Sequence, residues 1–159
     1  AGLELPGGLR VWRAYDRILF GYPGSQDLPA YCESLPGTGT FEMEGMGLRF
    51  ILKIRERTEI SSLNVSPNVA FLDAARVSFP LELRPVQPGD RFVPLGMRGR
   101  RKVKDFLIDC KVPLKERRRV PVLVSGENVT WLCGHRIDDR FKVNEGTGRI
   151  LEIRMESRG

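Results

Sequence analysis

The chain has 159 residues, of which 41% are hydrophobic and 29% charged, with a net charge of +6 and three cysteines. This length allows one domain with a buried core, and no apolar run approaches the roughly 20 residues of a membrane-spanning helix, which excludes such a span. The odd number and wide spacing of the cysteines exclude a disulfide framework and predict a reducing, cytoplasmic compartment. The N-terminus has no signal-peptide pattern. Because the chain begins Ala1-Gly2 rather than with Met, we expect it to be a piece of a longer protein.

The N-terminal part has the alternating apolar pattern of β-strands. Residues 9–13 and 17–20 predict a hairpin, and residues 40–43 and 48–57 predict a second strand pair around a glycine-rich turn. Between the two pairs, residues 21–39 hold three prolines and several glycines, which predicts a loop. The apolar face of the longest strand holds Leu48, Phe50, Leu52 and Ile54.

Residues 58–68 are polar and end in Ser66-Pro67-Asn68. We therefore expect a seam there, between a β-rich part at residues 3–57 and an α/β part at residues 69–155. In the second part the apolar pattern predicts strands at 69–72, 81–84 and 149–154 and a hairpin of 120–124 with 129–133.

The predicted helical segments are all short. Asp73 can cap one turn at residues 74–77, and Pro113 is expected to open a helix that reaches about Arg118. Residues 137–141 predict another helical turn. Spacing of i, i+3, i+4 and i+7 predicts a helix with one apolar face of Val103, Phe106, Leu107 and Cys110. The sum is an α+β fold with more strand than helix.

The positive charge of the chain is concentrated in residues 98–119. That segment holds ten lysines and arginines against three acidic residues, so the rest of the chain is close to neutral. Cations beside a helix N-terminus are repelled by the positive end of the helix dipole. An external anion bound there would offset this unfavourable electrostatic energy. A phosphate backbone is such an anion, whereas a solvated charged face is the simpler alternative. The candidate phosphate-binding residues are Arg98, Arg100, Arg101, Lys102 and Lys104, followed by Arg84, Arg91, Lys115, Arg117 and Arg118.

The segment Arg84–Phe92 has two interpretations. Its prolines and Gly89 predict a rigid structural turn in which Asp90 caps or pairs with Arg84 or Arg91. The functional alternative adds both arginines to the phosphate-binding surface.

The sequence contains no recognisable catalytic site. Cys133 and His135 supply at most two metal ligands, fewer than a structural zinc site needs. Asp138 and Asp139 are neighbours whose side chains usually point apart, so we expect a cap or an arginine pair rather than acid–base chemistry. The glycine-rich residues 36–40 lack the Gly-Lys-Ser/Thr of a nucleotide loop. We therefore expect a binding module without a metal site, and a stand-alone hydrolase would need a catalytic cluster that is not apparent.

Six motifs lie close together between Leu83 and Lys142. They are R-P-x-x-P-G-D-R-F at 84–92, P-L-G-M at 94–97, K-x-K-D-F-x-I-D at 102–109, K-V-P at 111–113, R-x-x-x-P at 117–121 and G-x-R-I-D-x-R-F-K at 134–142. Together they closely resemble the C-terminal domain of bacterial tRNA(Ile)-lysidine synthetases. Upstream, Leu5-Pro6-Gly7-Gly8 and Tyr15-Asp16 resemble the segment that precedes this domain.

The resemblance implies a layered, β-sandwich-like α+β domain with a few short helices, similar to a tRNA-synthetase β-subunit domain. The full enzyme of this family is an ATP-dependent ligase that attaches lysine to the wobble cytidine of an isoleucine tRNA and so forms lysidine. Its ATP site, used with magnesium and lysine, is a Ser-Gly-Gly-x-Asp-Ser loop in the catalytic domain, and this chain lacks that loop. The resemblance therefore implies no catalytic residue, no cofactor and no activity in this chain alone.

We accordingly expect residues 1–159 to form a single tRNA-recognition domain that holds the acceptor stem. Its expected partners are the isoleucine tRNA and the catalytic domain of the same enzyme, with a homodimer left open. A-form helices are read by phosphates and 2′-hydroxyls, which suits basic residues accompanied by few aromatic ones. The alternative is a structural docking domain whose basic face packs on the catalytic part without contacting RNA.

Overall fold

The computed structural model describes residues 2–4, 10–14, 17–21, 31–60, 63 and 66–157. Within these residues the α-helices are α1 (Val103–Asp109) and α2 (Leu114–Arg117), joined to the strands by turns and short 3-10 helices. None of the helices in the described ranges is long and apolar enough to cross a membrane. The strands are β1 (Gly2–Glu4), β2 (Arg10–Ala14), β3 (Arg17–Gly21), β4 (Glu33–Leu35), β5 (Gly39–Met43), β6 (Leu48–Glu56), β7 (Val69–Asp73), β8 (Leu81–Pro85), β9 (Arg91–Phe92), β10 (Arg101–Lys102), β11 (Pro121–Ser125), β12 (Asn128–Leu132), β13 (Arg136–Ile137) and β14 (Arg149–Ser157).

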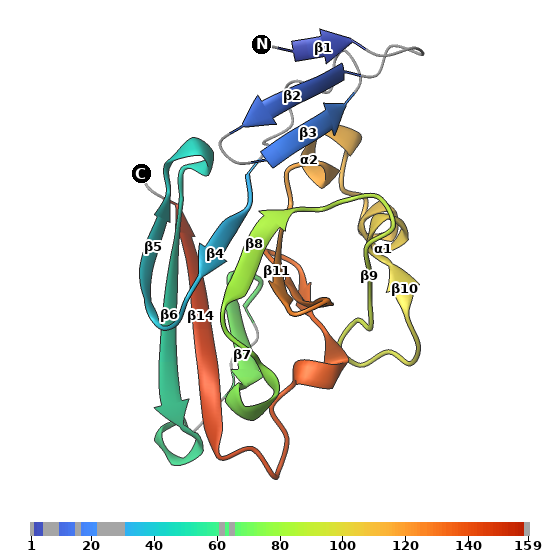
Figure 1. Cartoon of the computed structure of the whole chain (residues 1–159). Coiled ribbons are helices and arrows are strands. Elements are labelled where there is room, and N and C mark those ends of the chain that lie inside the picture. Colours follow the sequence, from blue (N-terminus) through green and yellow to red (C-terminus); the bar gives the residue numbers. More distant parts are fainter. Residues whose placement is uncertain are drawn as a thin grey trace.

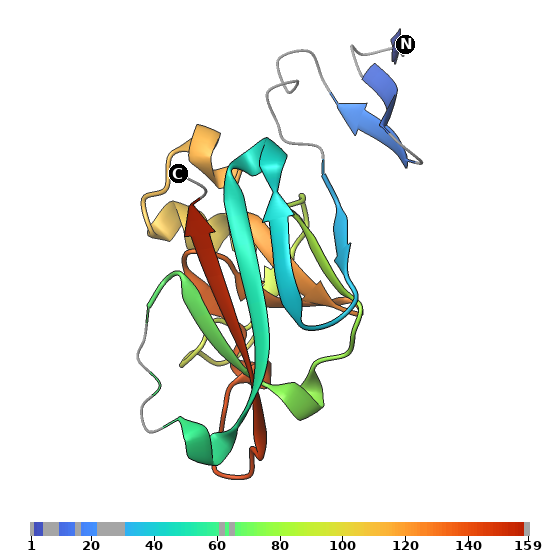
Figure 2. The ribbon, with the colours of Figure 1, turned by 90° about the vertical axis from the view of Figure 1, so that its left-hand side faces the viewer.

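Two antiparallel sheets pack face to face, and a third layer covers one of them (Figure 1). The central sheet has the strand order β13-β12-β11-β8-β4, and the outer sheet has the order β5-β6-β14-β7. Figure 2, turned by 90°, shows the outer sheet in front of the central one. Helix α1 and the β9-β10 pair form the third layer, on the other face of the central sheet (Figure 1). A separate three-stranded sheet, β1-β2-β3, is formed by the N-terminal strands. The packing of the two large sheets confirms the expected α+β, sandwich-like fold.

The first hydrophobic core lies between the central and outer sheets. Alternation along β6 directs Phe50 and Leu52 toward Leu83, Leu123 and Trp131 of the central sheet, and all five are at most 1% exposed. The rings of Phe50 and Trp131 meet edge to face with their centroids 6.5 Å apart. Full burial of each such side chain contributes about 1.5–3 kcal/mol, so this core holds the two sheets together.

The second core lies between the central sheet and α1. Val122 and Val124 flank Leu123 on β11 and therefore point to the opposite face of the sheet. There they join Phe106 and Leu107 of α1 in one buried cluster. Because β11 is buried on both faces, every one of its residues is enclosed. The consequence for function is that α1, and the basic residues beside it, are fixed on the sheet.

Most of the predicted elements are confirmed. The early hairpin, the β5-β6 pair, the β11-β12 hairpin and both helices are present close to their expected bounds. Asp73 accepts a hydrogen bond from the Ala75 N–H at 3.0 Å and so caps a short 3-10 helix, as expected. Pro113 is the N-cap of α2 instead of its first helical residue.

Two expectations about local structure were wrong. The predicted loop at 21–39 contains strand β4, which is only three residues long and is held by pairing with β8, so it has no periodicity of its own. Cys110 is exposed, because α1 ends at Asp109 and the chain turns away through Lys111, whose φ is 60°. The Val112 N–H then bonds to the Leu107 carbonyl at 3.0 Å and closes the helix.

Several predictions concern residues outside those the structure describes. They are the Leu5–Gly8 and Tyr15-Asp16 motifs, residues 22–30 of the expected loop, and residues 61, 62, 64 and 65 of the expected seam.

Candidate nucleic-acid interface

A tight loop between β9 and β10 carries the first of the candidate phosphate-binding residues. The chain turns at Gly96 and Gly99, whose φ angles of 84° and 77° lie in the region that favours glycine. The Met97 N–H closes the first turn by donating to the Pro94 carbonyl at 2.9 Å. The side chains of Arg98 and Arg100, which follow, are exposed.

The carboxylate of Asp138 ties this loop to the residues after β13. Asp138 is 0% exposed and accepts hydrogen bonds from the Val93 N–H at 2.9 Å and the Arg140 N–H at 2.8 Å. The guanidinium of Arg140 donates two more, at 3.0 and 2.9 Å, and these bonds raise the pKa of Arg140. Four donors satisfy the buried charge. Asp138 therefore caps a turn and pairs with an arginine, as the sequence predicted.

Asp139 holds the next part of the same loop. Its Oδ1 accepts a hydrogen bond from the Gly96 N–H at 3.1 Å, and its own N–H donates to the Val93 carbonyl at 2.7 Å. The bond from Gly96 is the main reason that the pKa of Asp139 is lowered, and Lys142 adds to the effect. The Leu95 N–H also donates to the Ile137 carbonyl at 3.1 Å. Residues 93–96 are thus fastened along their length.

Helix α1 is anchored by its apolar side and by backbone bonding. Val103 and Phe106 are buried, and the Phe106 ring meets the Phe92 ring edge to face at 5.2 Å. The Arg136 guanidinium lies 5.2 Å from the centre of the Phe106 ring, a cation–π contact. The Val103 N–H donates to the Asp90 carbonyl at 2.9 Å. One of the free N–H groups expected at the start of this helix is therefore used within the protein.

Of the five phosphate-binding candidates between Arg98 and Lys104, four are exposed and unpaired. Within the described part of the chain, they make no ion pair or side-chain hydrogen bond. Lys102 also stands directly opposite Arg91 in the β9-β10 register, and both are exposed. Like charges in this position repel each other, and no acidic side chain among the described residues pairs with either of them. The four residues are Arg98, Arg100, Lys102 and Lys104, and together with Arg91 we call them the basic surface.

Two other candidates are already engaged. Arg84 donates to both carboxylate oxygens of Asp90, at 2.8 and 2.9 Å, and its side chain is 13% exposed. Burial alone would lower the pKa of Arg84, but the bonds and the charge of Asp90 outweigh it and raise the pKa. Arg101 forms an ion pair with Asp109, at the other end of α1, and lies 6.0 Å from the centre of the Phe106 ring. The geometry of Arg84 agrees with the structural interpretation of the 84–92 motif.

The last three candidates belong to α2 and its C-cap. Lys115 and Arg118 are exposed and Arg117 is half-buried. Figure 1 shows the β9-β10 loop, α1 and α2 following one another along one side of the molecule. The basic surface and α2 are therefore neighbours in the fold as well as in the sequence.

His135 lines a cavity that sequence reasoning missed. In the described residues, no three His, Cys, Asp or Glu side chains are grouped to hold a metal ion, and Cys133 is 2% exposed, with burial raising its pKa.

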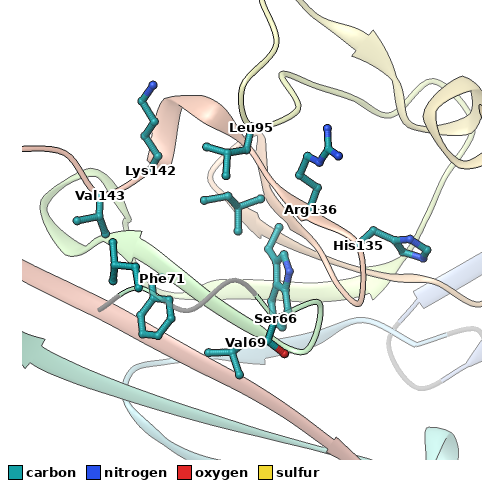
Figure 3. Close-up of a pocket in the computed structure, with 11 residues that line it drawn as sticks. Ser66, Val69, Phe71, Leu95, His135, Arg136, Lys142 and Val143 are labelled. Carbon is teal, nitrogen blue, oxygen red and sulfur yellow. The ribbon is translucent and has the colours of Figure 1, made fainter. Parts of the chain in front are cut away.

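The cavity has a volume of about 300 Å³ and lies between edge strands β7 and β13 (Figure 3). Its walls come from segments far apart in the sequence, so no local sequence pattern could have predicted it.

Comparison with known proteins gives consistent similarities. Residues 81–155 match the family described as "TilS substrate C-terminal domain". The chain is 28% identical over 151 residues to the tRNA(Ile)-lysidine synthase of Caldanaerobacter subterraneus subsp. tengcongensis and 32% identical over 157 residues to that of Geobacter sulfurreducens. These alignments cover 95% and 98% of the chain, but the chain spans only 32% and 33% of those two relatives.

A solved structure has the same fold. It is titled "Crystal structure of TILS C-terminal domain" and superposes with a TM-score of 0.71 at 25% sequence identity. The match covers 82% of this chain and 99% of the other. The layers described above are therefore shared with that domain.

Proposed function

The chain belongs to the family of tRNA(Ile)-lysidine synthase C-terminal domains, and from this premise we propose that it binds the acceptor stem of an isoleucine tRNA. In this proposal the basic surface meets phosphates of the stem, while α1 and the 93–96 segment keep it in place. Positioning by phosphate contacts is the usual way in which proteins grip a duplex without reading its bases.

Unpaired cations on a well-anchored part of the fold support this proposal most directly. Four cations are exposed and unpaired within the described residues: Arg98, Arg100, Lys102 and Lys104. The nearby carboxylates of Asp138 and Asp139 instead accept hydrogen bonds from the backbone of the loop that carries these cations. Repulsion between Arg91 and Lys102 lowers stability unless an anion lies nearby. Such an arrangement is stabilised when phosphate groups arrive and counterions leave.

The remainder of the function belongs to the parts of the enzyme beyond this chain. We propose that the parent protein is a cytoplasmic, ATP-dependent ligase that joins lysine to the wobble cytidine of the same tRNA. ATP, magnesium and lysine would bind the catalytic domain, which would also be a partner of this one. On this view the chain contributes substrate binding and no chemistry.

The test is a salt-dependent titration of the 159-residue chain with isoleucine tRNA. Replacing Arg98 and Arg100 by alanine should lower the affinity and reduce the slope of log K against log salt by about two, one for each lost phosphate contact. The matched control replaces Lys53 and Arg149 of the outer sheet by alanine, which removes the same charge far from the basic surface. Equal effects of the two double variants, or no effect of either, would refute the assignment.

The second candidate is the docking domain, and exposed apolar side chains favour it. Ile108 of α1 is 43% exposed and Leu114 of α2 is 54% exposed. Aliphatic groups suit a protein partner better than a phosphate backbone. If the chain binds the separate catalytic domain but not tRNA, and Ile108→Ser/Leu114→Ser abolishes that binding, the docking function replaces the one proposed.

A further inference from the structure

The cavity beside β13 has apolar walls contributed by both sheets. Val69 and Phe71 come from β7 of the outer sheet, and Trp131 and Ile137 come from the central sheet. Leu95, from the loop that precedes the basic surface, closes the opposite side (Figure 3). The volume of about 300 Å³ is at the lower end of the range for small-molecule sites, enough for one flat ring system and too small for a duplex.

The indole N–H of Trp131, in this wall, has no acceptor among the described residues. Trp131 is 1% exposed, and its indole N–H donates to nothing within the described part of the chain. Among the described side chains, the Tyr31 hydroxyl is the fully buried polar atom that has no hydrogen-bond partner. The Trp131 indole nitrogen is not in that class, so a small part of it is accessible from the cavity. Since buried indole N–H groups normally find a partner, the cavity is where an acceptor can reach this one.

The rim of the cavity is positively charged. Its charge comes from Arg136 and Lys142, and the described residues that line the cavity include no acidic one; His135 also lies at the rim. Figure 3 shows their polar ends directed outward from the apolar centre. Lys142 also pairs with Asp139 at 3.2 Å but remains 48% exposed, so it can still meet an anion at the mouth. Burial lowers the pKa of His135, which leaves a neutral ring able to donate one hydrogen bond and accept another.

We propose that this cavity binds one unpaired nucleotide of the RNA whose stem lies on the basic surface, with the base between Phe71 and Leu95 and its phosphate at Arg136 and Lys142. This inference rests on the proposed function, since it needs RNA on the neighbouring surface. A base fits each feature, because it is flat, carries hydrogen-bond acceptors for Trp131 and is joined to an anion. Proteins that read unpaired RNA bases use such pockets, in which stacking is combined with contacts to the base edge.

Two cavity-lining residues link the cavity to the segments that carry the basic surface. Leu95 lines the cavity and belongs to the same β9-β10 loop as Arg98, three residues further on. On the other side, Arg136 lines the cavity and also stacks on Phe106 of α1. A strand that leaves the end of a stem on this surface would therefore pass the mouth of the cavity.

The test compares two RNA hairpins with the acceptor-stem sequence of an isoleucine tRNA. One has a blunt end and the other a single-stranded 3′ extension of four nucleotides. The wild-type chain should bind the extended hairpin about tenfold more tightly, the effect of one stacked base. Val143→Phe, which fills the cavity, should abolish this difference and keep the affinity for the blunt hairpin. Arg98→Ala should weaken both and keep the ratio.

An NMR measurement supplies the second readout. The indole N–H signal of Trp131, observed in a Trp12→Phe background, should shift with the extended hairpin and stay in place with the blunt one. Thermal unfolding of Val143→Phe verifies that the variant folds. Equal affinities with an unmoved Trp131 signal would overturn this inference and leave the proposed function intact. Failure to bind either hairpin would instead overturn the proposed function and, with it, this inference.

Discussion

Lys102 lies directly opposite Arg91 in the antiparallel pairing of β9 and β10. Both side chains are exposed, and a cross-strand pair of like charges destabilises a sheet by up to about 1 kcal/mol. Removing either charge should therefore help the free protein and harm a complex with a polyanion. Opposite signs for the two effects distinguish a binding surface from a solvated charged face.

The first prediction uses this contrast. Lys102→Thr should raise the free energy of unfolding by about 0.5 kcal/mol, because the repulsion is removed and threonine favours strands. The same change should reduce the slope of log K for tRNA against log salt by about one. Urea unfolding and salt titration measure the two effects. Lys53→Thr on β6 is the control, since it makes the same replacement in a strand of the outer sheet and should leave the slope unchanged.

The second prediction concerns Arg84. Because its guanidinium holds both oxygens of Asp90, Arg84→Lys should lower the free energy of unfolding by about 1–3 kcal/mol, since lysine cannot form the two parallel bonds. The slope of tRNA affinity against salt should not change. A reduced slope with unchanged stability in urea would instead assign Arg84 to phosphate binding.

The third prediction separates two adjacent aspartates. Asp138→Asn replaces one of the two buried acceptor oxygens by an amide NH2 group, so two of the four hydrogen bonds to this side chain are lost, and urea unfolding should show a loss of about 2–3 kcal/mol. Asp139→Asn should cost less than about 1 kcal/mol, because the amide oxygen can still accept from the Gly96 N–H. Each variant is the control for the other, and equal losses would contradict the assignment of the buried role to Asp138.

The fourth prediction is a pH dependence from the one histidine in the chain. Burial lowers the pKa of His135 from its usual 6.5, so between that lowered value and pH 6.5 the unfolded chain binds more protons than the folded one. Stability should therefore be full above pH 6.5 and fall as the pH drops through this window. His135→Gln should flatten the curve of melting temperature against pH between 5 and 7. An unchanged curve in this variant would show that His135 does not titrate with unfolding.

Much of the fold follows from local patterns in the sequence. The alternation in Leu48–Glu56 and Arg149–Ser157 marks the two longest strands, and the spacing of Val103, Phe106 and Leu107 marks α1. Strand β4 and the two-residue strands β9 and β10 could not be predicted, because a period needs several repeats to be visible. Their conformation comes from the strands to which they pair.

The order of residues is enough to show where the apolar positions fall, where the charge is concentrated and, through the motifs, which family the chain resembles. Which cations are available depends on the packed chain, since Arg84 is largely buried against Asp90 whereas Arg98 is exposed and has no acidic partner among the described residues. The tertiary structure also decided that Asp138 serves a loop 45 residues away and that Phe71 and Leu95 face one cavity. The physical reason is range: apolar periodicity acts within one element, whereas ion pairs and cavities depend on distances that only the packed chain defines.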